Sequence, residues 1–289
     1  MTKKISITQK HFVYFLILYI VSIIAVGIYS YYIAQKSILE RTYNQLTSVR
    51  VEKAKHIERF FDDRINEIQI IINTNSLQNV FNTNVNSNIE LEFLHKFLSL
   101  GKYYSKIFLI KSNLEMLSIE SNSKIKNQFI NNNNNLKNNY LDSLIERIVK
   151  TKKTIIQDFK IRKDGTISFY IGSPVFSIEE NKLLGFIVFE IIPSNINNIM
   201  YDANKNNGLG KSGESYIVGS DLLLRTSSRF QENSIKNIRV NTNSTRNAFH
   251  LQSGTEIIKD YRNIDVLSSY APFNYNNLKW AVITEIDKE

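Results

Sequence analysis

The first 34 residues divide into a short basic segment and a long uncharged one. Residues 12–34, FVYFLILYIVSIIAVGIYSYYIA, contain no Asp, Glu, Lys or Arg. A helix of this length spans about 34 Å, and the hydrocarbon core of a bilayer is about 30 Å thick. Tyr29, Tyr31 and Tyr32 gather at one end, as residues of an interfacial aromatic belt do. The pattern predicts a transmembrane helix over residues 12–34.

Apolar residues recur every three or four positions in the segment that follows. They are Leu39, Tyr43, Leu46, Val49, Ala54, Ile57, Phe61, Ile65, Ile68 and Ile72. Charged residues occupy the other faces, so the spacing predicts one amphipathic helix over residues 35–72 that continues from the membrane. Such a helix can serve as a stalk, as a dimer seam or as the support on which a sheet packs, and the sequence leaves these roles open.

The middle of the chain mixes predicted helices and strands. Residues 73–89 are rich in Asn, Ser and Thr, which indicates a loop or an irregular helical segment. Helices are predicted over residues 90–100 and 140–150, and the Asn run 131–135 is interpreted as a surface loop. Strands are predicted over residues 106–111, 115–119, 154–159, 166–171, 174–177 and 183–192.

A second, smaller group of strands follows Pro193 and a short predicted helix over residues 194–201. These strands are expected over residues 214–219, 222–226, 254–261, 265–273 and 278–286, with a helix over residues 244–251. Helices and antiparallel strands in two successive groups favour an α+β fold with two modules. We predict a tail (1–11), a transmembrane helix (12–34), a long helix (35–72), a membrane-distal module (73–192), a connector (193–203) and a membrane-proximal module (204–289).

The net charge of +9 raises the question of nucleic-acid binding. Lys3, Lys4 and Lys10 precede Glu40, the first acidic residue, which leaves 33 basic and 27 acidic residues, net +6, spread along the rest of the chain. No Lys/Arg run exceeds Lys152-Lys153, and no nucleic-acid-binding motif is present, so we predict no nucleic-acid partner. The three early lysines instead predict a cytoplasmic tail, with the bulk of the protein outside the cytoplasmic (inner) membrane.

A cleaved signal peptide is the alternative to a membrane anchor. The basic start and the small-x-small sequence Ala25-Val26-Gly27 have the form of a secretory signal with its cleavage site. We favour an uncleaved anchor, because the apolar run continues well past that site.

The sequence offers little for catalysis. The absence of Cys excludes disulfides, Cys-ligated metal sites and cysteine nucleophiles. The histidines at 11, 56, 95 and 250 stand at no metal-ligand spacing, and no G-x-S-x-G motif is present. The stretch 208–213, GLGKSG, is not a Walker loop, because Lys205 stands where that motif requires Gly. We therefore predict no enzymatic activity, no metal and no cofactor.

Residues 208–230, GLGKSGESYIVGSDLLLRTSSRF, carry a specific resemblance. They resemble the signature G-L-G-x-[ST]-G-E-[ST]-Y-[LI]-V-G-x-D-x-L-[ML]-R-[ST]-x-S-R-F of double Cache (dCache) sensor domains in bacterial methyl-accepting chemotaxis receptors and sensor histidine kinases. FYIGSPVF at 169–176 with LGFIVF at 184–189, and DVLSSY at 265–270 with WAVITEID at 280–287, are similar to other strands of that family. The resemblance implies a long N-terminal helix packed on two successive PAS-like antiparallel-sheet modules.

The signature itself is expected to be structural. Its glycines permit a tight turn, and its charged residues form ion pairs and turn hydrogen bonds that fix the loop. The residues concerned are Gly208, Gly210, Gly213, Glu214, Tyr216, Asp221, Arg225, Ser228 and Arg229.

By resemblance, a ligand would bind in the distal module, between the sheet and its covering loops. We predict as ligand-binding residues Tyr103, Tyr104, Asp158, Phe159, Phe169 and Tyr170. Asp158 is the only charged one on a predicted strand and favours a cationic or amine-bearing ligand. The chain departs from the amino-acid-binding subgroup of the family, since its only Trp is Trp280, in the proximal module. The identity of the ligand is therefore left open.

These inferences together predict the extracytoplasmic small-molecule-sensing region of a transmembrane signalling receptor. Expected partners are a small-molecule ligand, the membrane through residues 12–34, a second copy in a homodimer, and a cytoplasmic output domain such as a chemotaxis signalling domain, a kinase or a cyclase. The alternatives are a secreted solute-binding protein released near Gly27 and, less favoured, an extracytoplasmic enzyme.

Overall fold

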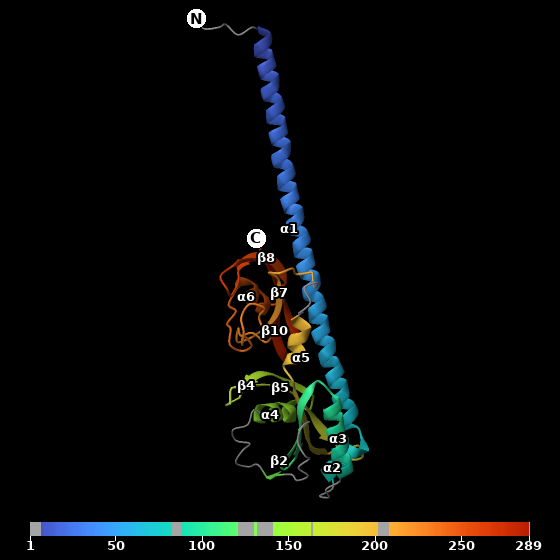
Figure 1. Cartoon of the computed structure of the whole chain (residues 1–289). Coiled ribbons are helices and arrows are strands. Elements are labelled where there is room, and N and C mark those ends of the chain that lie inside the picture. Colours follow the sequence, from blue (N-terminus) through green and yellow to red (C-terminus); the bar gives the residue numbers. More distant parts are fainter. Residues whose placement is uncertain are drawn as a thin grey trace.

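The protein is seen in a computed structural model that describes residues 7–82, 88–120, 130–131, 141–162, 164–201 and 208–288. Its first element, α1 (Ile7–Ile72), is one continuous helix. Residues 12–34 are exposed along their whole length, and this part of the helix reaches a mean hydropathy of 2.5. In Figure 1 it extends far beyond the rest of the chain. The predicted apolar helix and the predicted amphipathic helix are thus two parts of α1.

The first sheet has six antiparallel strands in the order β3-β2-β1-β6-β5-β4. They are β1 (Tyr104–Lys111), β2 (Glu115–Glu120), β3 (Ile130–Asn131), β4 (Ile155–Ile161), β5 (Ile167–Phe176) and β6 (Leu183–Ile191). The helices α2 (Asn75–Asn82), α3 (Asn88–Leu100) and α4 (Asp142–Thr151) accompany it. We call it the distal sheet, because it lies at the far end of the molecule from the N-terminus (Figure 1).

The second sheet has four antiparallel strands in the order β7-β10-β9-β8. They are β7 (Glu214–Gly219), β8 (Gly254–Lys259), β9 (Asp265–Tyr275) and β10 (Leu278–Asp287), with the helix α6 (Asn243–Phe249). The helix α5 (Ser194–Met200) precedes it, within the predicted connector. We call this second sheet the proximal sheet. The two sheets and the long helix confirm the predicted α+β fold.

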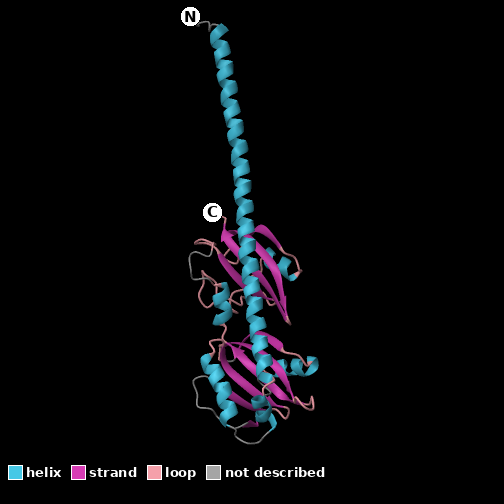
Figure 2. Cartoon of the chain, turned by 90° about the vertical axis from the view of Figure 1, so that its right-hand side faces the viewer, coloured by secondary structure: helices cyan, strands magenta, loops and turns pink. Residues whose placement is uncertain are grey.

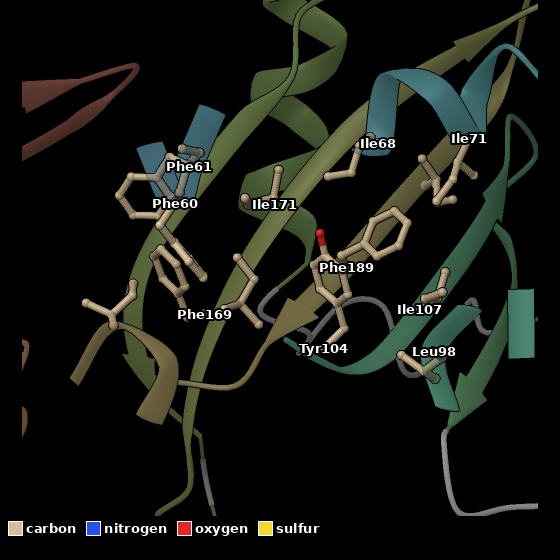
Figure 3. Packing of buried hydrophobic residues seen from close by; sticks show 14 of the residues in the cluster. Phe60, Phe61, Ile68, Ile71, Leu98, Tyr104, Ile107, Phe169, Ile171 and Phe189 are labelled. Carbon is tan, nitrogen blue, oxygen red and sulfur yellow. The ribbon is translucent and has the colours of Figure 1, made fainter. Parts of the chain in front are cut away.

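The helix α1 runs across both sheets (Figure 2). Ile57, Phe61 and Ile68 are fully buried in a core that contains residues from the distal sheet and, at Trp280 and Val282, from the proximal sheet. Figure 3 shows this packing, with Phe61 of α1 beside Phe169 of β5. Burying large apolar side chains is the dominant stabilising contribution to such a core. The apolar stripe of α1 therefore supports the sheets of its own chain and is not free to form a dimer seam.

Two differences from the predicted strands have local causes. The predicted strands 166–171 and 174–177 are one strand, β5, which contains Pro174. Proline lacks a backbone N–H and is usually confined to strand edges. Pro174 pairs with Phe186 of β6, whereas the pairing of β5 with β4 ends at Gly172, so no ladder bond to β4 is lost.

The predicted strand over residues 222–226 is wrong. This segment makes only two isolated bridges, between Val218 and Leu224 and between Leu223 and Arg239. Leu222 has a positive φ of 64°, which an extended strand does not have. Residues 132–135 of the Asn run lie outside the described residues, and Asn131 ends β3.

Candidate functional site

Three of the six predicted ligand-binding residues lie in the core beneath α1. Tyr104, Phe159 and Phe169 are all buried there, and Figure 3 shows Tyr104 and Phe169 in this packing. The hydroxyl of Tyr104 donates to Oε2 of Glu67 at 2.6 Å, and burial followed by this hydrogen bond raises the Tyr104 pKa. The rings of Phe159 and Phe169 stack with centroids 4.7 Å apart. Their contacts are those of core residues, and ligand binding by them stays a prediction.

Tyr103 and Asp158 lie elsewhere. Tyr103 is 39 % exposed, and the guanidinium carbon of Arg64 stands 3.9 Å from its ring centroid. Asp158 accepts hydrogen bonds from Arg225 and Trp280, both in the C-terminal part of the chain. The structure therefore does not gather the six residues at one place.

Tyr170 lies on the opposite face of the distal sheet, which α4 covers, and belongs to a row of polar side chains. Cross-strand pairing aligns Gln157 with Tyr170, Tyr170 with Glu190, Glu190 with Lys106, and Lys106 with Glu120. Directly paired residues in a sheet point to the same face. We call these five residues the polar row; it crosses β4, β5, β6, β1 and β2.

Arg162, just after β4, reaches the middle of the polar row. Its Nη2 donates to the hydroxyl of Tyr170 at 2.6 Å and to Oε1 of Glu190. Burial acts to lower the pKa of Arg162, but the bond to Tyr170 and the charge of Glu190 outweigh it, so the pKa is raised. Burial, and then the charge of Glu190, raises the pKa of Tyr170. This part of the row thus brings together a guanidinium group, a carboxyl group and a phenol whose pKa is raised.

The polar row lies beside the first turn of α4. The amide of Gln157 and Nζ of Lys160 both donate to Oγ of Ser143, at 3.4 and 3.0 Å. Further along the helix, Leu144 and Ile148 pack so closely on Gly172 that a Cβ there would stand 2.7 Å from Cδ1 of Ile148. The absence of a side chain at Gly172 therefore allows α4 to pack directly on the apolar residues of this face.

Glu190 is the residue of the polar row that most needs a further partner. It is only 6 % exposed, and among the described residues no hydrogen bond reaches its Oε2. A buried carboxylate oxygen without a donor is costly, so an N–H or O–H group of a bound molecule would be stabilised there. Arg162 beside it, and Lys106, which pairs with Glu120 at 2.7 Å, offer positive charge to an acidic or carbonyl group.

The predicted residues include Tyr170 but not Glu190, Arg162 or Lys106. The sequence does contain an indication of Glu190. It is the only charged residue of β6, LLGFIVFEI, whose other residues are apolar or Gly, as in a buried strand. Arg162 and Lys106 carry no such signal, since Arg162 has Lys160 and Lys163 beside it in the sequence and Lys106 is one of two lysines in its strand.

The signature residues hold the start of the proximal sheet together. Glu214 accepts from the hydroxyl of Tyr261 at 2.6 Å and from the backbone N–H of Arg229 at 3.0 Å. Arg229 donates to the carbonyl oxygens of Gly210 and Gly213, and Ser228 donates to Glu214. Gly208 and Gly210 have positive φ values of 77° and 63°, which glycine adopts at little cost.

The remaining signature residues lie inside the proximal sheet or at its edge. Tyr216 donates to Glu285 at 2.7 Å, and Arg225 pairs with Asp221 at 2.9 Å. These contacts lie within the fold, and a structural role for the signature residues stays a prediction.

A second candidate site lies beside the signature loop. This hollow, of about 630 Å³, is lined by polar residues together with Tyr201 and Phe230. Its charged lining residues are Arg229 and Glu232, and the guanidinium of Arg229 is already bonded to two backbone carbonyls. In the polar row, by contrast, Oε2 of Glu190 lacks a donor among the described residues, so the row is the stronger candidate. In the part of the chain that the structure describes, no three His, Asp or Glu side chains are grouped to hold a metal ion.

The fold is shared with ligand-binding domains of bacterial chemoreceptors. No protein-family model and no curated protein sequence matches the chain. The solved domain of Campylobacter jejuni chemoreceptor Tlp3, in complex with L-valine, has a TM-score of 0.62 and 12 % identity and covers 88 % of this chain and 95 % of its own. That of the Pseudomonas aeruginosa amino acid chemoreceptor PctC, in complex with GABA, has a TM-score of 0.60 and 11 % identity over 85 % and 100 %.

A third, from Pseudomonas fluorescens chemoreceptor CtaA in complex with L-serine, has a TM-score of 0.60 and 12 % identity over 86 % of this chain and 98 % of its own. At this level of identity the likeness establishes the fold and not the ligand. The chain has the double Cache fold, which its signature at residues 208–230 indicates.

Proposed function

We propose that this protein is the extracytoplasmic small-molecule-sensing region of a bacterial transmembrane signalling receptor, anchored in the inner membrane by residues 12–34. The observation that carries the proposal is Glu190, a buried carboxylate with one unpartnered oxygen, on the distal sheet of a fold found in chemoreceptor ligand-binding domains. The exposed, uncharged first part of α1 supports the membrane anchor. No catalytic step is assigned to these residues.

The polar row favours a small ligand that carries both a donor group and an anionic group. Glu190 would accept from an ammonium or hydroxyl group, and Arg162 would donate to a carboxylate, whose planar geometry matches a guanidinium. The three similar domains are described with GABA, L-serine and L-valine, all of which carry an amino and a carboxyl group. We therefore propose an amino acid or a related zwitterion as the ligand, bound at the polar row and not at Asp158.

The test is a thermal-shift screen of the full chain in detergent micelles with the common L-amino acids, GABA, dicarboxylates and sugars. A compound that binds only the native state stabilises it by about 2.7 kcal/mol at 100 times its Kd, which raises the melting temperature. Glu190→Gln and Arg162→Gln should each weaken binding at least about tenfold, the equivalent of 1.4 kcal/mol. Glu180→Gln, on the exposed β5–β6 turn, is the matched control and should bind as wild type does.

Binding that survives both row substitutions would overturn the proposed site. A screen in which only sugars or dicarboxylates raise the melting temperature would overturn the zwitterion proposal.

The remaining parts of the proposal are the partners. A homodimer and a cytoplasmic output domain, such as a chemotaxis signalling domain, a kinase or a cyclase, are expected of a receptor of this class. The dimer cannot use the apolar stripe of α1, because that stripe packs on the chain's own sheets. The outer face of α1, which carries Glu52, Lys55, Arg59 and Asp63, is exposed and charged, so a seam along it would consist of ion pairs.

A second candidate function is that of a secreted solute-binding protein. The observation in its favour is the small-x-small sequence Ala25-Val26-Gly27 inside the apolar run. In that case the ligand site would be the same, but the mature protein would be released from the membrane.

A further inference from the structure

The edge strand of the distal sheet is held by the turn of a hairpin from the proximal sheet. Asn276 and Asn277 form the turn between β9 and β10. The side chain of Asn277 accepts from the backbone N–H of Ile156 at 3.1 Å and donates to the carbonyl of the same residue. Asn276 donates to the carbonyl of Thr154 at 3.1 Å. An edge strand normally leaves such groups unpaired, so these two amides act for β4 as a neighbouring strand would.

A bulge in β4 turns the next side chain toward the proximal sheet. Gln157 pairs with Tyr170, and Lys160 pairs with Ser168, so Asp158 and Phe159 both fall in the interval opposite Phe169. Bulges of this kind re-aim a side chain. Both oxygens of Asp158 accept from Arg225, from Nε at 2.8 Å and from Nη2 at 2.7 Å.

The same carboxylate is bound by the only tryptophan of the chain. Nε1 of Trp280 donates to Oδ1 of Asp158 at 3.0 Å. The Trp280 ring lies 6.1 Å from that of Phe159, the other residue of the bulge. Arg225 is 2 % exposed and Trp280 is 1 % exposed, whereas the Asp158 side chain is 32 % exposed, so the two donors of this contact are buried and the carboxylate is partly exposed. We call Asp158, Arg225, Trp280 and Asn277 the β4 clasp.

β4 therefore takes part in two contacts through adjacent residues. Gln157 belongs to the polar row, and Asp158, the next residue, belongs to the β4 clasp. From Trp280 the strand β10 runs to Asp287, at the end of the proximal sheet beside the middle of α1 (Figure 1). Its neighbour β9 contacts α1 at Ser269, which bonds Thr47 and Arg50. A displacement of β4 would thus be transmitted through β10 to the end of the proximal sheet nearest the apolar part of α1.

We infer that the β4 clasp couples the polar row of the distal sheet to the proximal sheet. The inference rests on the proposed function only in naming the polar row as the place where a ligand acts. The competing route is α1 itself, which packs on both sheets and could carry a signal without the clasp. A route through the clasp is lost when the clasp is cut, whereas a route through α1 is not.

The test is hydrogen–deuterium exchange of the full chain in lipid nanodiscs, read by mass spectrometry on peptides from residues 278–287. Glu190→Gln serves as the perturbation of the polar row, because it removes the charge that Arg162 contacts. With the β4 clasp intact, Glu190→Gln should change the exchange rates of these amides at least about threefold. In an Asp158→Asn background, the same substitution should change them by less than about 1.5-fold.

Asp221→Asn is the matched control, since Asp221 pairs with the same Arg225 guanidinium and with Lys236, whereas Asp158 is the partner of Arg225 on the distal sheet. The response to Glu190→Gln should persist in that background. If Asp158→Asn does not fold, Asn277→Ala cuts the clasp at its other contact and replaces it. An equal response in the intact and cut backgrounds, or none in either, would overturn the inference.

The ligand screen keeps the two proposals apart. If no compound stabilises the chain, the proposed ligand site fails while the exchange experiment still decides on the β4 clasp. If L-serine or another compound of the screen binds and leaves the exchange of residues 278–287 unchanged, the coupling fails and the ligand site stands.

Discussion

Glu285 of β10 lies directly opposite Glu214 of β7, so two buried carboxyl groups form a cross-strand pair in the proximal sheet. Like charges placed opposite each other destabilise a sheet. Burial is the largest cause that raises the pKa of Glu285, to about 8, and the charges of Glu214 and Asp260 add to it against the hydrogen bond from Tyr216. Burial likewise raises the pKa of Glu214. Glu285 is therefore mostly protonated in the folded protein at neutral pH.

This pair predicts a folded state that loses stability as the pH rises. The folded-state pKa of Glu285, about 8, exceeds the value of about 4.3 for an unfolded glutamate, so between these values the folded state holds a proton that the unfolded state has released. The contribution is complete below about pH 4.3 and is lost by about pH 8, with a slope of up to about 1.4 kcal/mol per pH unit.

Urea unfolding of the full chain at a series of pH values measures this slope. Glu285→Gln, which keeps a neutral side chain of the same shape at every pH, should flatten the curve between about pH 5 and 8. Glu179→Gln, on the exposed β5–β6 turn, should leave the slope unchanged. A wild-type slope that persists in Glu285→Gln would show that other groups are responsible.

Asp158→Ala should lower the free energy of unfolding. It removes two hydrogen bonds to the charged Arg225 and one from Trp280, and it leaves a buried guanidinium with Asp221 as its remaining carboxylate. Hydrogen bonds to charged groups contribute about 1.5–3 kcal/mol, and Asp158 is one-third exposed, so we expect a loss of about 2 kcal/mol. Trp280 is the only tryptophan, so its emission during urea unfolding reports this region alone. An unchanged midpoint would mean that the ion pair contributes nothing to stability.

Gly219→Ala should disrupt the ion pair between Asp158 and Arg225 by displacing the Arg225 guanidinium. A Cβ at this position would stand 1.9 Å from Nη2 of Arg225, so the guanidinium must move away from Asp158. Overpacking of this kind costs about 1–3 kcal/mol, and loss of the ion pair adds to it. Ser220→Ala, at the adjacent exposed position, is the control and should change the melting temperature by no more than a degree or so, as surface substitutions usually do. Equal melting temperatures for the two variants would contradict the placement of Arg225.

The sequence predicted those features that depend on local pattern. The uncharged run, the three-and-four spacing of α1 and the alternation of the strands indicate elements that the structure contains. The family signature supplied the double Cache fold, including the packing of the helix on two sheets. Within the signature, the strand expected at residues 222–226 failed because a positive φ at Leu222 breaks it, and apolar composition does not reveal a backbone angle.

The candidate site was harder to predict, because it depends on strand register. Glu190 and Tyr170 are 20 positions apart in sequence and become neighbours only through the pairing of β5 with β6. The sequence predicts Asp158 as a ligand-binding residue because it is a charge on a predicted strand. Its true neighbours are Trp280 of the proximal sheet and Arg225, which follows β7, and a bulge turns it toward them. A one-residue bulge reverses the direction of a side chain and has no reliable sequence signal.

The last prediction concerns the first part of α1. Residues 12–34 are uncharged and exposed, and soluble proteins rarely present so long an apolar surface to water. We expect the full chain to stay in the membrane fraction after extraction at alkaline pH and to begin at Met1 by N-terminal sequencing. A variant that lacks residues 12–34 should be recovered in the soluble fraction, with a far-UV spectrum that differs from that of the full chain only by the loss of helical signal, because the two sheets pack only on later turns of α1. A mature chain that begins near Ile28 and is released without extraction would instead identify a secreted binding protein, since cleavage after Gly27 leaves too few apolar residues to span a bilayer.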